Sequence, residues 1–383
     1  MRPSPLADVA LIETSAGTLR LGRAWPRAGG TVHLEYTDAH RGRVAAQWLP
    51  ARAEAERVAR ACGVPVELHP DHPVVVHWGG ADRQLPALRT LVLEAGTRLV
   101  GHRPGRRGVV QLRDGTYAKV VRPGRSPGLV AAGERATAAA AGHFDVPVVV
   151  RHDPDAGVVV WTELAGPTLL DLGRSAPSPD VLAAAWRAAG AAVSGLHRAD
   201  RQGLPVHDAR AEVATAQRWR DAAVAAGVLP PAGHPAAYER LLSGTPGPLG
   251  VLHRDLHDKQ VVVGAHIGLL DLDTLAVGER ALDLANALAH LELRVDQGLM
   301  TAAAAEVARR AFLEGADPDP ETRERIPAHL GVARLRLAGV YAFRPRWRGL
   351  AVRWHAQATG TAPAEGAVPV VSPYAARLAR APR

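Results

Sequence analysis

Two apolar runs enclose a charged loop in Leu252-His253-Arg254-Asp255-Leu256-His257-Asp258-Lys259-Gln260-Val261-Val262-Val263, and a second strand-like run, Gly268-Leu269-Leu270-Asp271-Leu272-Asp273, follows it. The apolar flanks predict short strands that anchor the loop. Phosphoryl transfer needs a carboxylate that accepts a hydroxyl proton and oxygen ligands that hold Mg²⁺ against the phosphates. Asp255 can be that base, while Gln260 offers an amide oxygen and Asp271 a carboxylate.

This pattern resembles the aminoglycoside phosphotransferase and choline kinase-like family, relatives of the protein kinases, whose H-x-D-x-x-x-x-N loop precedes a strand with a metal-binding aspartate. The resemblance extends over about residues 97–293. It implies that Asp255 is the base, that Gln260 and Asp271 bind the metal, and that Asp283, at the start of a D-L-A helix, is a buried brace for the loop.

The loop departs from the family at Gln260, where the family has asparagine. The extra methylene moves the amide oxygen, so the second metal contact stays open, and Asp273 either shares the metal or caps the next turn. The same histidines and aspartates also allow a set of buried polar residues or a metal-dependent hydrolase. The order His253-x-Asp255-x-His257 does not match H-E-x-x-H, which favours the kinase-like interpretation.

Lysine is scarce, because Lys119 and Lys259 are the only lysines among 46 lysine and arginine residues. A kinase-like site needs a strand lysine that holds the α- and β-phosphates and a glutamate on the next helix that orients it. Lys119 follows the Asp114-Gly115 hairpin turn, and Glu134 lies on the following predicted helix. Lys259 lies between the base and the amide ligand, where it either neutralises charge on the moving phosphate or points to solvent.

Two further segments are candidates for nucleotide binding. The loop over residues 101–108 should fold over the phosphates, with backbone N–H groups beside its glycines and the guanidinium of Arg106 or Arg107 as phosphate donors. Glu163-Leu164-Ala165-Gly166 occupies the hinge position of the family, where backbone groups of Glu163 and Ala165 would pair with adenine.

The chain has 383 residues with 47% hydrophobic and 22% charged side chains, which is typical of an ordered protein with more than one lobe. We expect an α+β, two-lobed protein-kinase-like fold. It comprises a small N-terminal α+β module of unknown role (residues 1–96), a nucleotide-binding β-rich lobe (97–165), a helical catalytic and substrate lobe (166–356) and a flexible tail (357–383). In the β-rich lobe, a helix is predicted over 129–141 and strands over 146–150 and 158–162.

Several classes of protein are disfavoured by composition. No window holds the roughly 20 apolar residues of a membrane helix, and the N-terminus lacks a secretory signal, so we expect a cytoplasmic protein without a membrane partner. Cys62 is the only cysteine, which excludes an intramolecular disulfide. The net charge is +8, but the arginines are scattered, which disfavours nucleic acid as a partner. The densest cluster, residues 344–354, predicts a solvated helix face with tryptophan anchors.

Together these features predict an enzyme that uses ATP and Mg²⁺ to phosphorylate a hydroxyl group of a small molecule such as an aminoglycoside or a sugar. No D-F-G or A-P-E segment separates Asp271 from the next helix, which disfavours protein substrates. Glu292 and Asp296 are candidates for a cationic acceptor or belong to ordinary helix surface. The alternative is a regulatory pseudokinase that binds nucleotide without transfer. The oligomeric state and the preference for ATP over GTP stay open.

Overall fold

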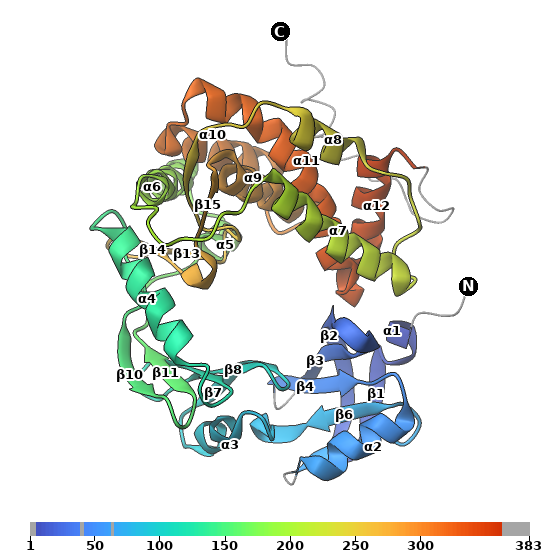
Figure 1. The fold of residues 1–383 in the computed structure, drawn as a ribbon. Helices are drawn as coiled ribbons and strands as arrows, with labels where there is room; N and C mark the ends of the chain where they lie inside the picture. The colour runs from blue at the N-terminus through green and yellow to red at the C-terminus, as the bar shows by residue number, and fades with distance from the viewer. Residues whose placement is uncertain (1–4, 39–41, 63–64, 362–383) are drawn as a thin grey trace.

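Figure 1 shows the chain as a computed structural model, which describes residues 5–38, 42–62 and 65–361. The predicted flexible tail lies outside the described residues from position 362 onward. Its first residues belong to the last helix, which ends at Thr359. Among the described residues, every helix is too short or too polar to cross a membrane.

The N-terminal module forms a six-stranded antiparallel sheet in the order β1-β2-β3-β4-β6-β5. Three consecutive residues are buried in both β3 and β4, so both faces of this sheet are covered there, because successive side chains of a strand point to opposite faces. The elements are α1 (Pro5–Asp8), β1 (Leu11–Thr14), β2 (Gly17–Pro26), β3 (Val32–Asp38), β4 (Gly42–Trp48), α2 (Arg52–Ala61), β5 (Val66–Leu68) and β6 (Val74–His77). One face packs against α2, and the other joins the largest hydrophobic core.

The β-rich lobe is a five-stranded antiparallel sheet in the order β10-β11-β9-β8-β7. A helix from the N-terminal module, α3 (Pro86–Leu93), covers one face, and α4 (Pro127–Ala140) packs near Trp161 on the other. The strands are β7 (Arg98–Arg103), β8 (Arg107–Gln111), β9 (Tyr117–Val121), β10 (Val149–Asp153) and β11 (Val158–Trp161). The strand predicted over 146–150 is wrong in position, because β10 starts only at Val149 and pairs with β11 as far as Asp153.

Helices dominate the helical lobe, and two short ladders carry its charged loop. The helices are α5 (Leu169–Arg174), α6 (Pro179–His197), α7 (Ala209–Ala225), α8 (Ala236–Ser243), α9 (Ala281–Asp296), α10 (Ala302–Ala316), α11 (Pro320–Ala342) and α12 (Arg348–Thr359). The strands are β12 (Leu249–Leu252), β13 (Val261–Val263), β14 (Ile267–Leu269) and β15 (Ala276–Glu279). Glycines permit the tight crossing of α6 and α10, since a Cβ at Gly190 or Gly315 would collide with the backbone of the other helix.

The N-terminal module also contacts the far end of the helical lobe. The backbone N–H of Ala24 in β2 donates to the carbonyl of Phe343, just after α11, at 2.8 Å. Figure 1 shows the resulting ring, in which the N-terminal module reaches both the β-rich lobe and the end of α11. The predicted tryptophan anchor is present in α12, where Trp354 is buried and donates to Asp296 at 2.6 Å.

Candidate active site

Two strand ladders hold the catalytic loop, residues 253–260, in place. β12 enters the loop and pairs with β15, while β13 leaves it and pairs with β14. The N–H of Leu270 donates to the carbonyl of Gln260 at 2.8 Å, which extends the second ladder by one step. The end of the loop therefore lies beside the segment that contains Asp271.

Asp283 is the predicted buried brace, and the structure confirms it. Its Oδ2 accepts the N–H of His253 and its Oδ1 the N–H of Arg254, both at 2.8 Å, while His197 Nε2 lies 3.3 Å from Oδ2. Burial raises the pKa of Asp283, but hydrogen bonding from His197 and the charges of His197 and His253 outweigh it, so the net shift is downward. Asn286 adds a hydrogen bond to the carbonyl of Arg254 at 3.0 Å.

The proposed base is exposed on one side and held on the other. The side chain of Asp255 is 51% exposed, and Arg336 Nη1 of α11 lies 3.5 Å from its Oδ1. The same guanidinium donates to Asn286 Oδ1 at 2.8 Å and lies 3.4 Å from Glu212 Oε1. Asp255 Oδ2 therefore remains available to an incoming hydroxyl group. Arg336 was not predicted, because it lies 81 positions from Asp255 in the sequence and no motif links the two.

The two predicted metal ligands lie on neighbouring segments. Asp271 is exposed, Gln260 is half-buried, and neither side chain has a hydrogen-bond or ion-pair partner among the described residues. Asp271 has a φ of 58°, a left-handed conformation that is uncommon outside glycine. Two oxygen donors without protein partners, on neighbouring segments, fit the preference of Mg²⁺ for carboxylate and amide oxygens.

Lys119 reaches across to the helical lobe and pairs with Asp273, two residues beyond Asp271. The prediction that Glu134 orients this lysine is wrong for this structure, because Glu134 is exposed and the ion pair of Lys119 is with Asp273. Gly133 gives the physical reason. It faces Trp161 so closely that a Cβ would collide with the indole, and the next residue is rotated by about 100° around the helix, away from the sheet.

Asp258 belongs to the scaffold of the catalytic loop. It is 1% exposed, and Arg294 of α9 binds both carboxylate oxygens, at 2.6 and 2.7 Å. His257 and His290 offer nitrogen atoms near Asp258, but Arg294 already occupies the carboxylate that a metal would need. This arrangement does not favour the hydrolase alternative.

Lys259 lies at the surface with its amine partly surrounded by protein, and no carboxylate pairs with it among the described residues. Its pKa is lowered, first by partial burial and then by the charges of Arg294 and Arg344. A lysine beside these guanidinium groups is a site of high positive potential, which suits an anionic ligand.

The predicted phosphate loop is shorter than expected. β7 and β8 extend to Arg103 and Arg107, so only residues 104–106 form the turn. Both backbone groups of Gly105 are occupied, because its N–H donates to Asp82 at 2.6 Å and its carbonyl accepts from Arg122 at 2.7 Å. Binding of phosphate by the Gly105 N–H, one of the predicted donors, is therefore wrong for this structure, whereas Arg106 is exposed and Arg107 half-buried.

The hinge joins β11 to α5. Among the described residues, the backbone N–H and carbonyl groups of Glu163 and Ala165 make no backbone hydrogen bond, so they are free to meet a planar base. The Tyr117 hydroxyl lies 3.5 Å from the Glu163 carboxylate. A separate cavity of about 570 Å³ is lined by none of the predicted site residues.

The two carboxylates suggested for a cationic acceptor already have partners. Arg334 binds Glu292 with two hydrogen bonds, at 2.6 and 2.7 Å. Asp296 accepts the indole N–H of Trp354. Both carboxylates therefore connect α9 to its neighbouring helices. These contacts favour the ordinary helix surface over a role in binding the acceptor.

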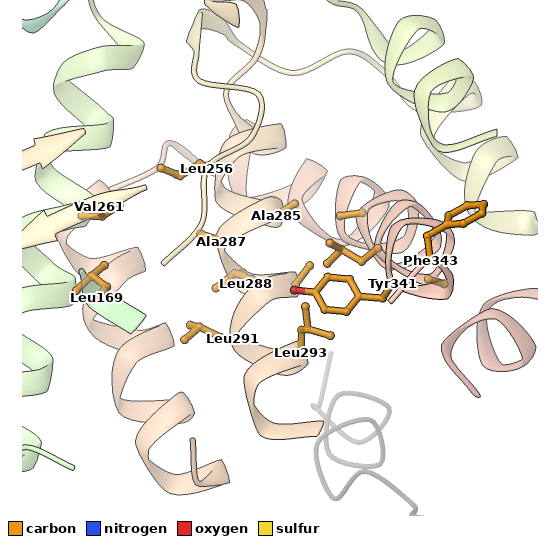
Figure 2. Packing of buried hydrophobic residues seen from close by; sticks show 14 of the residues in the cluster. Leu169, Leu256, Val261, Ala285, Ala287, Leu288, Leu291, Leu293, Tyr341 and Phe343 are labelled. Atoms are coloured by element: carbon orange, nitrogen blue, oxygen red, sulfur yellow. The ribbon is translucent and has the colours of Figure 1, made fainter. Parts of the chain in front are cut away.

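A hydrophobic layer supports the catalytic loop from below. Figure 2 shows Leu256, in the middle of the loop, and Val261, directly after it, in one hydrophobic cluster with apolar side chains of α9 and with Tyr341 of α11. Leu256 is 1% exposed. Burial of a leucine contributes about 1.5–3 kcal/mol, so the central residue of the loop is itself an anchor.

Comparison with known proteins agrees with the geometry. Residues 99–325, more than half of the chain, match the phosphotransferase enzyme family. No curated protein matches the sequence.

Solved structures with a similar fold include three phosphotransferases. Aminoglycoside phosphotransferase APH(3'')-Id from Streptomyces rimosus is 19% identical, with 66% of this chain and 98% of that chain covered and a TM-score of 0.47. Macrolide 2'-phosphotransferase MphH from Brachybacterium faecium is 20% identical, with 68% and 98% covered and a TM-score of 0.41. A glucosamine kinase is 19% identical, with 93% and 96% covered and a TM-score of 0.41.

The predicted two-lobed α+β fold and the predicted enzyme class are thus confirmed. A strand-borne lysine meets an aspartate-bearing segment, a braced loop presents Asp255, and the family match spans all of these elements. The chain belongs to the phosphotransferase enzyme family.

Proposed function

We propose that this phosphotransferase transfers the γ-phosphoryl group of ATP, with Mg²⁺, to a hydroxyl group of a small molecule such as an aminoglycoside or a sugar. The observation that carries the proposal is the placement of three groups with different chemistry on segments that contact one another, through His253 and Leu270 and through Lys119 and Asp273. Asp255 is an exposed carboxylate, Asp271 has no protein partner, and Lys119 approaches the same segment through Asp273. Phosphoryl transfer requires a base, a metal ligand and a cation of this kind.

Asp271 and Gln260 would hold the metal, and both have the oxygen atoms that Mg²⁺ prefers. Bound Mg²⁺ would neutralise charge on the phosphate oxygens and keep the γ-phosphoryl group in line for attack. Lys119 would then exchange Asp273 for the α- and β-phosphates. The free backbone groups of Glu163 and Ala165 support adenine binding at the hinge.

In the transfer step, Asp255 Oδ2 accepts the proton of the acceptor hydroxyl group. The hydroxyl oxygen forms a bond to the γ-phosphorus, and the bond between that phosphorus and the β–γ bridging oxygen breaks. ADP leaves with the bonding electrons, and the phosphorylated acceptor keeps the new ester bond. Lys259, beside the loop, would stabilise negative charge on the moving group.

A small acceptor is supported by the short connection after the metal segment. Only nine positions, residues 272–280, separate Asp271 from the first residue of α9, and β15 with its preceding turn fills most of them. This stretch leaves no room for a segment that docks a peptide. Glu292 and Asp296 are engaged within the protein, so they give no support for a cationic acceptor.

The test is ATP-dependent mass gain in a panel of sugars, aminoglycosides and pooled metabolites, with ADP release measured in parallel. We expect turnover that requires Mg²⁺ and falls about 10²- to 10⁴-fold in Asp255→Ala, because a positioned general base contributes about that much. Lys259→Ala should reduce kcat less. Full activity of Asp255→Ala, or no ADP release with any acceptor, contradicts the proposal. Stabilisation by ATP without turnover or metal dependence would favour the pseudokinase alternative.

A further inference from the structure

A pair of arginines connects the N-terminal module to the β7–β8 hairpin, which contains the predicted phosphate loop. Arg23 of β2 lies over the indole of Trp25 at 4.0 Å from the ring centroid, and Arg103 of β7 lies at 4.6 Å from the same ring. One guanidinium comes from each part of the chain. Trp25 therefore sets the spacing between two positive charges.

These charges are poorly compensated within the protein. Arg103 and Arg107 face each other directly across the β7–β8 ladder, and like charges in this position are destabilising. Among the described residues, no carboxylate forms an ion pair with either of them. Arg23 has Glu35 at 3.8 Å, but Glu35 also pairs with Arg43.

The surroundings of both guanidinium groups disfavour their positive charge. The pKa of Arg23 is lowered to about 10, chiefly by burial and, after the opposing effect of Glu35, by Arg344. The pKa of Arg103 is also lowered to about 10, by burial and then by Arg107. Both groups stay charged at neutral pH, and a bound anion would offset the desolvation and the repulsion between them.

The charges of the cluster are coupled to those of the proposed phosphate site. Asp271, the proposed metal ligand, is close enough to act on the charge of Arg103, and Arg344 acts on both Arg23 and Lys259 of the catalytic loop. The hydrogen bond from Ala24 to Phe343 fixes this side of the N-terminal module against the helical lobe.

Backbone donors at the hairpin tip are not available to bind phosphate there. The N–H of Gly105 is bound to Asp82, which is buried and also bonded to His102. Side-chain donors must therefore provide the contacts, and guanidinium groups bind phosphate oxygens in a bidentate manner.

We propose that Arg23, Arg103 and Arg107 form an oxyanion site, through which the N-terminal module takes part in binding phosphate. The ligand is either the polyphosphate of the nucleotide or an anionic group on the acceptor. The inference rests on the proposed function for its biological role, but the site itself can be tested without turnover. Arg23 and Trp25 lie outside residues 99–325, so the family match assigns them nothing.

The experiment measures the Kd of inorganic tripolyphosphate, and of ATP, ADP and AMP with Mg²⁺, by titration calorimetry on the full chain. Arg23→Met and Arg103→Met should each weaken tripolyphosphate about 10- to 100-fold, as expected for loss of a hydrogen bond to a charged group. Arg43→Met is the matched control, because Arg43 contacts the same Glu35 from the neighbouring part of the sheet, and it should leave the Kd unchanged.

The pattern across ligands identifies the source of the anion. If the variants bind ATP and ADP more weakly but AMP unchanged, the anion is the polyphosphate of the nucleotide. If they bind nucleotides unchanged but bind tripolyphosphate more weakly and show a raised KM for the acceptor, the anion is a group on the acceptor. Equal tripolyphosphate affinity in the parent, Arg23→Met and Arg103→Met overturns the inference, as does a parent that does not bind it. If thermal unfolding shows that a methionine variant is not folded, Arg23→Lys and Arg103→Lys replace it and should show a smaller loss. Failure of the proposed function is distinct, because it appears as missing turnover in the parent.

Discussion

Replacement of Asp283 by alanine should remove the main support of the catalytic loop. The carboxylate accepts two backbone N–H groups, of His253 and Arg254, at 2.8 Å each, and it is completely buried. Hydrogen bonds to a charged group contribute about 1.5–3 kcal/mol each, so two of them correspond to about 3–6 kcal/mol. The contact with His197, at 3.3 Å, stabilises the carboxylate further, beyond these two bonds.

This loss is large relative to a total unfolding free energy of about 5–15 kcal/mol. Urea unfolding of Asp283→Ala, followed by circular dichroism, should show a midpoint well below that of the parent. The midpoint of Asp283→Asn should lie between those of the parent and Asp283→Ala. The amide oxygen still accepts one backbone N–H, but the NH₂ group faces the other N–H and cannot accept from it. Asp296→Ala is the matched control at the opposite end of α9, where one hydrogen bond from Trp354 is lost. It should cost about 1 kcal/mol.

The same substitution should also lower kcat in protein that remains folded. Arg254 has a φ of 71°, which costs about 1–2 kcal/mol for a residue other than glycine, and the bond from its N–H to Asp283 offsets that cost. Without the bond the loop relaxes and Asp255 moves. If Asp283→Ala unfolds within about 1 kcal/mol of the parent, or keeps full activity, the brace argument is refuted.

Two further predictions concern buried arginines of α11 and acid stability. Arg336→Met should lower kcat and change KM little. In an Asp255→Ala background it should not lower kcat further, because Arg336 acts by holding that carboxylate. An equal loss of kcat in both backgrounds would contradict this. Arg325→Met, an equally buried arginine that binds Glu279, should reduce stability but leave kcat unchanged. Burial raises the pKa of Glu279, but the close contact with His329, 3.4 Å away, and hydrogen bonds from Arg325 lower it to about 2. Since the pKa of Glu279 in the folded protein lies below the usual 4.5, its ionised carboxylate stabilises the fold above pH 4.5, and this stabilisation should be lost as the pH falls toward 2. The free energy of unfolding should therefore fall more on acidification in the parent than in Arg325→Met.

The sequence was most informative where one short segment supplies several chemical groups. Asp255, Gln260 and Asp271 are separated only by a loop and one hairpin, and local strand pairing places Gln260 beside the segment that contains Asp271. Asp283 was predictable for the same reason, because β15 returns the chain to β12 directly before α9 begins. Such short-range geometry follows from apolar flanks and turn length alone.

Contacts that depend on helix rotation or on distant segments were not predictable. The Lys119–Glu134 pairing failed because the face of α4 is set by Gly133 against Trp161, a packing choice that periodicity does not reveal. Arg294 reaches Asp258 from 36 positions away, and its role depends on the exact crossing of α9 below the loop. The sequence does not indicate which distant residue a long side chain on a helix will contact.

The occupied backbone of Gly105 changes how the N-terminal module can be understood. A glycine-rich loop binds phosphate through free N–H groups, but here Asp82, from the end of that module, uses the N–H and fixes the turn. The module thus removes a backbone donor and, through Arg23 and Trp25, adds a guanidinium beside Arg103. On this inference, guanidinium donors take the place of the backbone donor that Asp82 occupies. On this argument a module outside the family match is part of the binding site rather than an appendage.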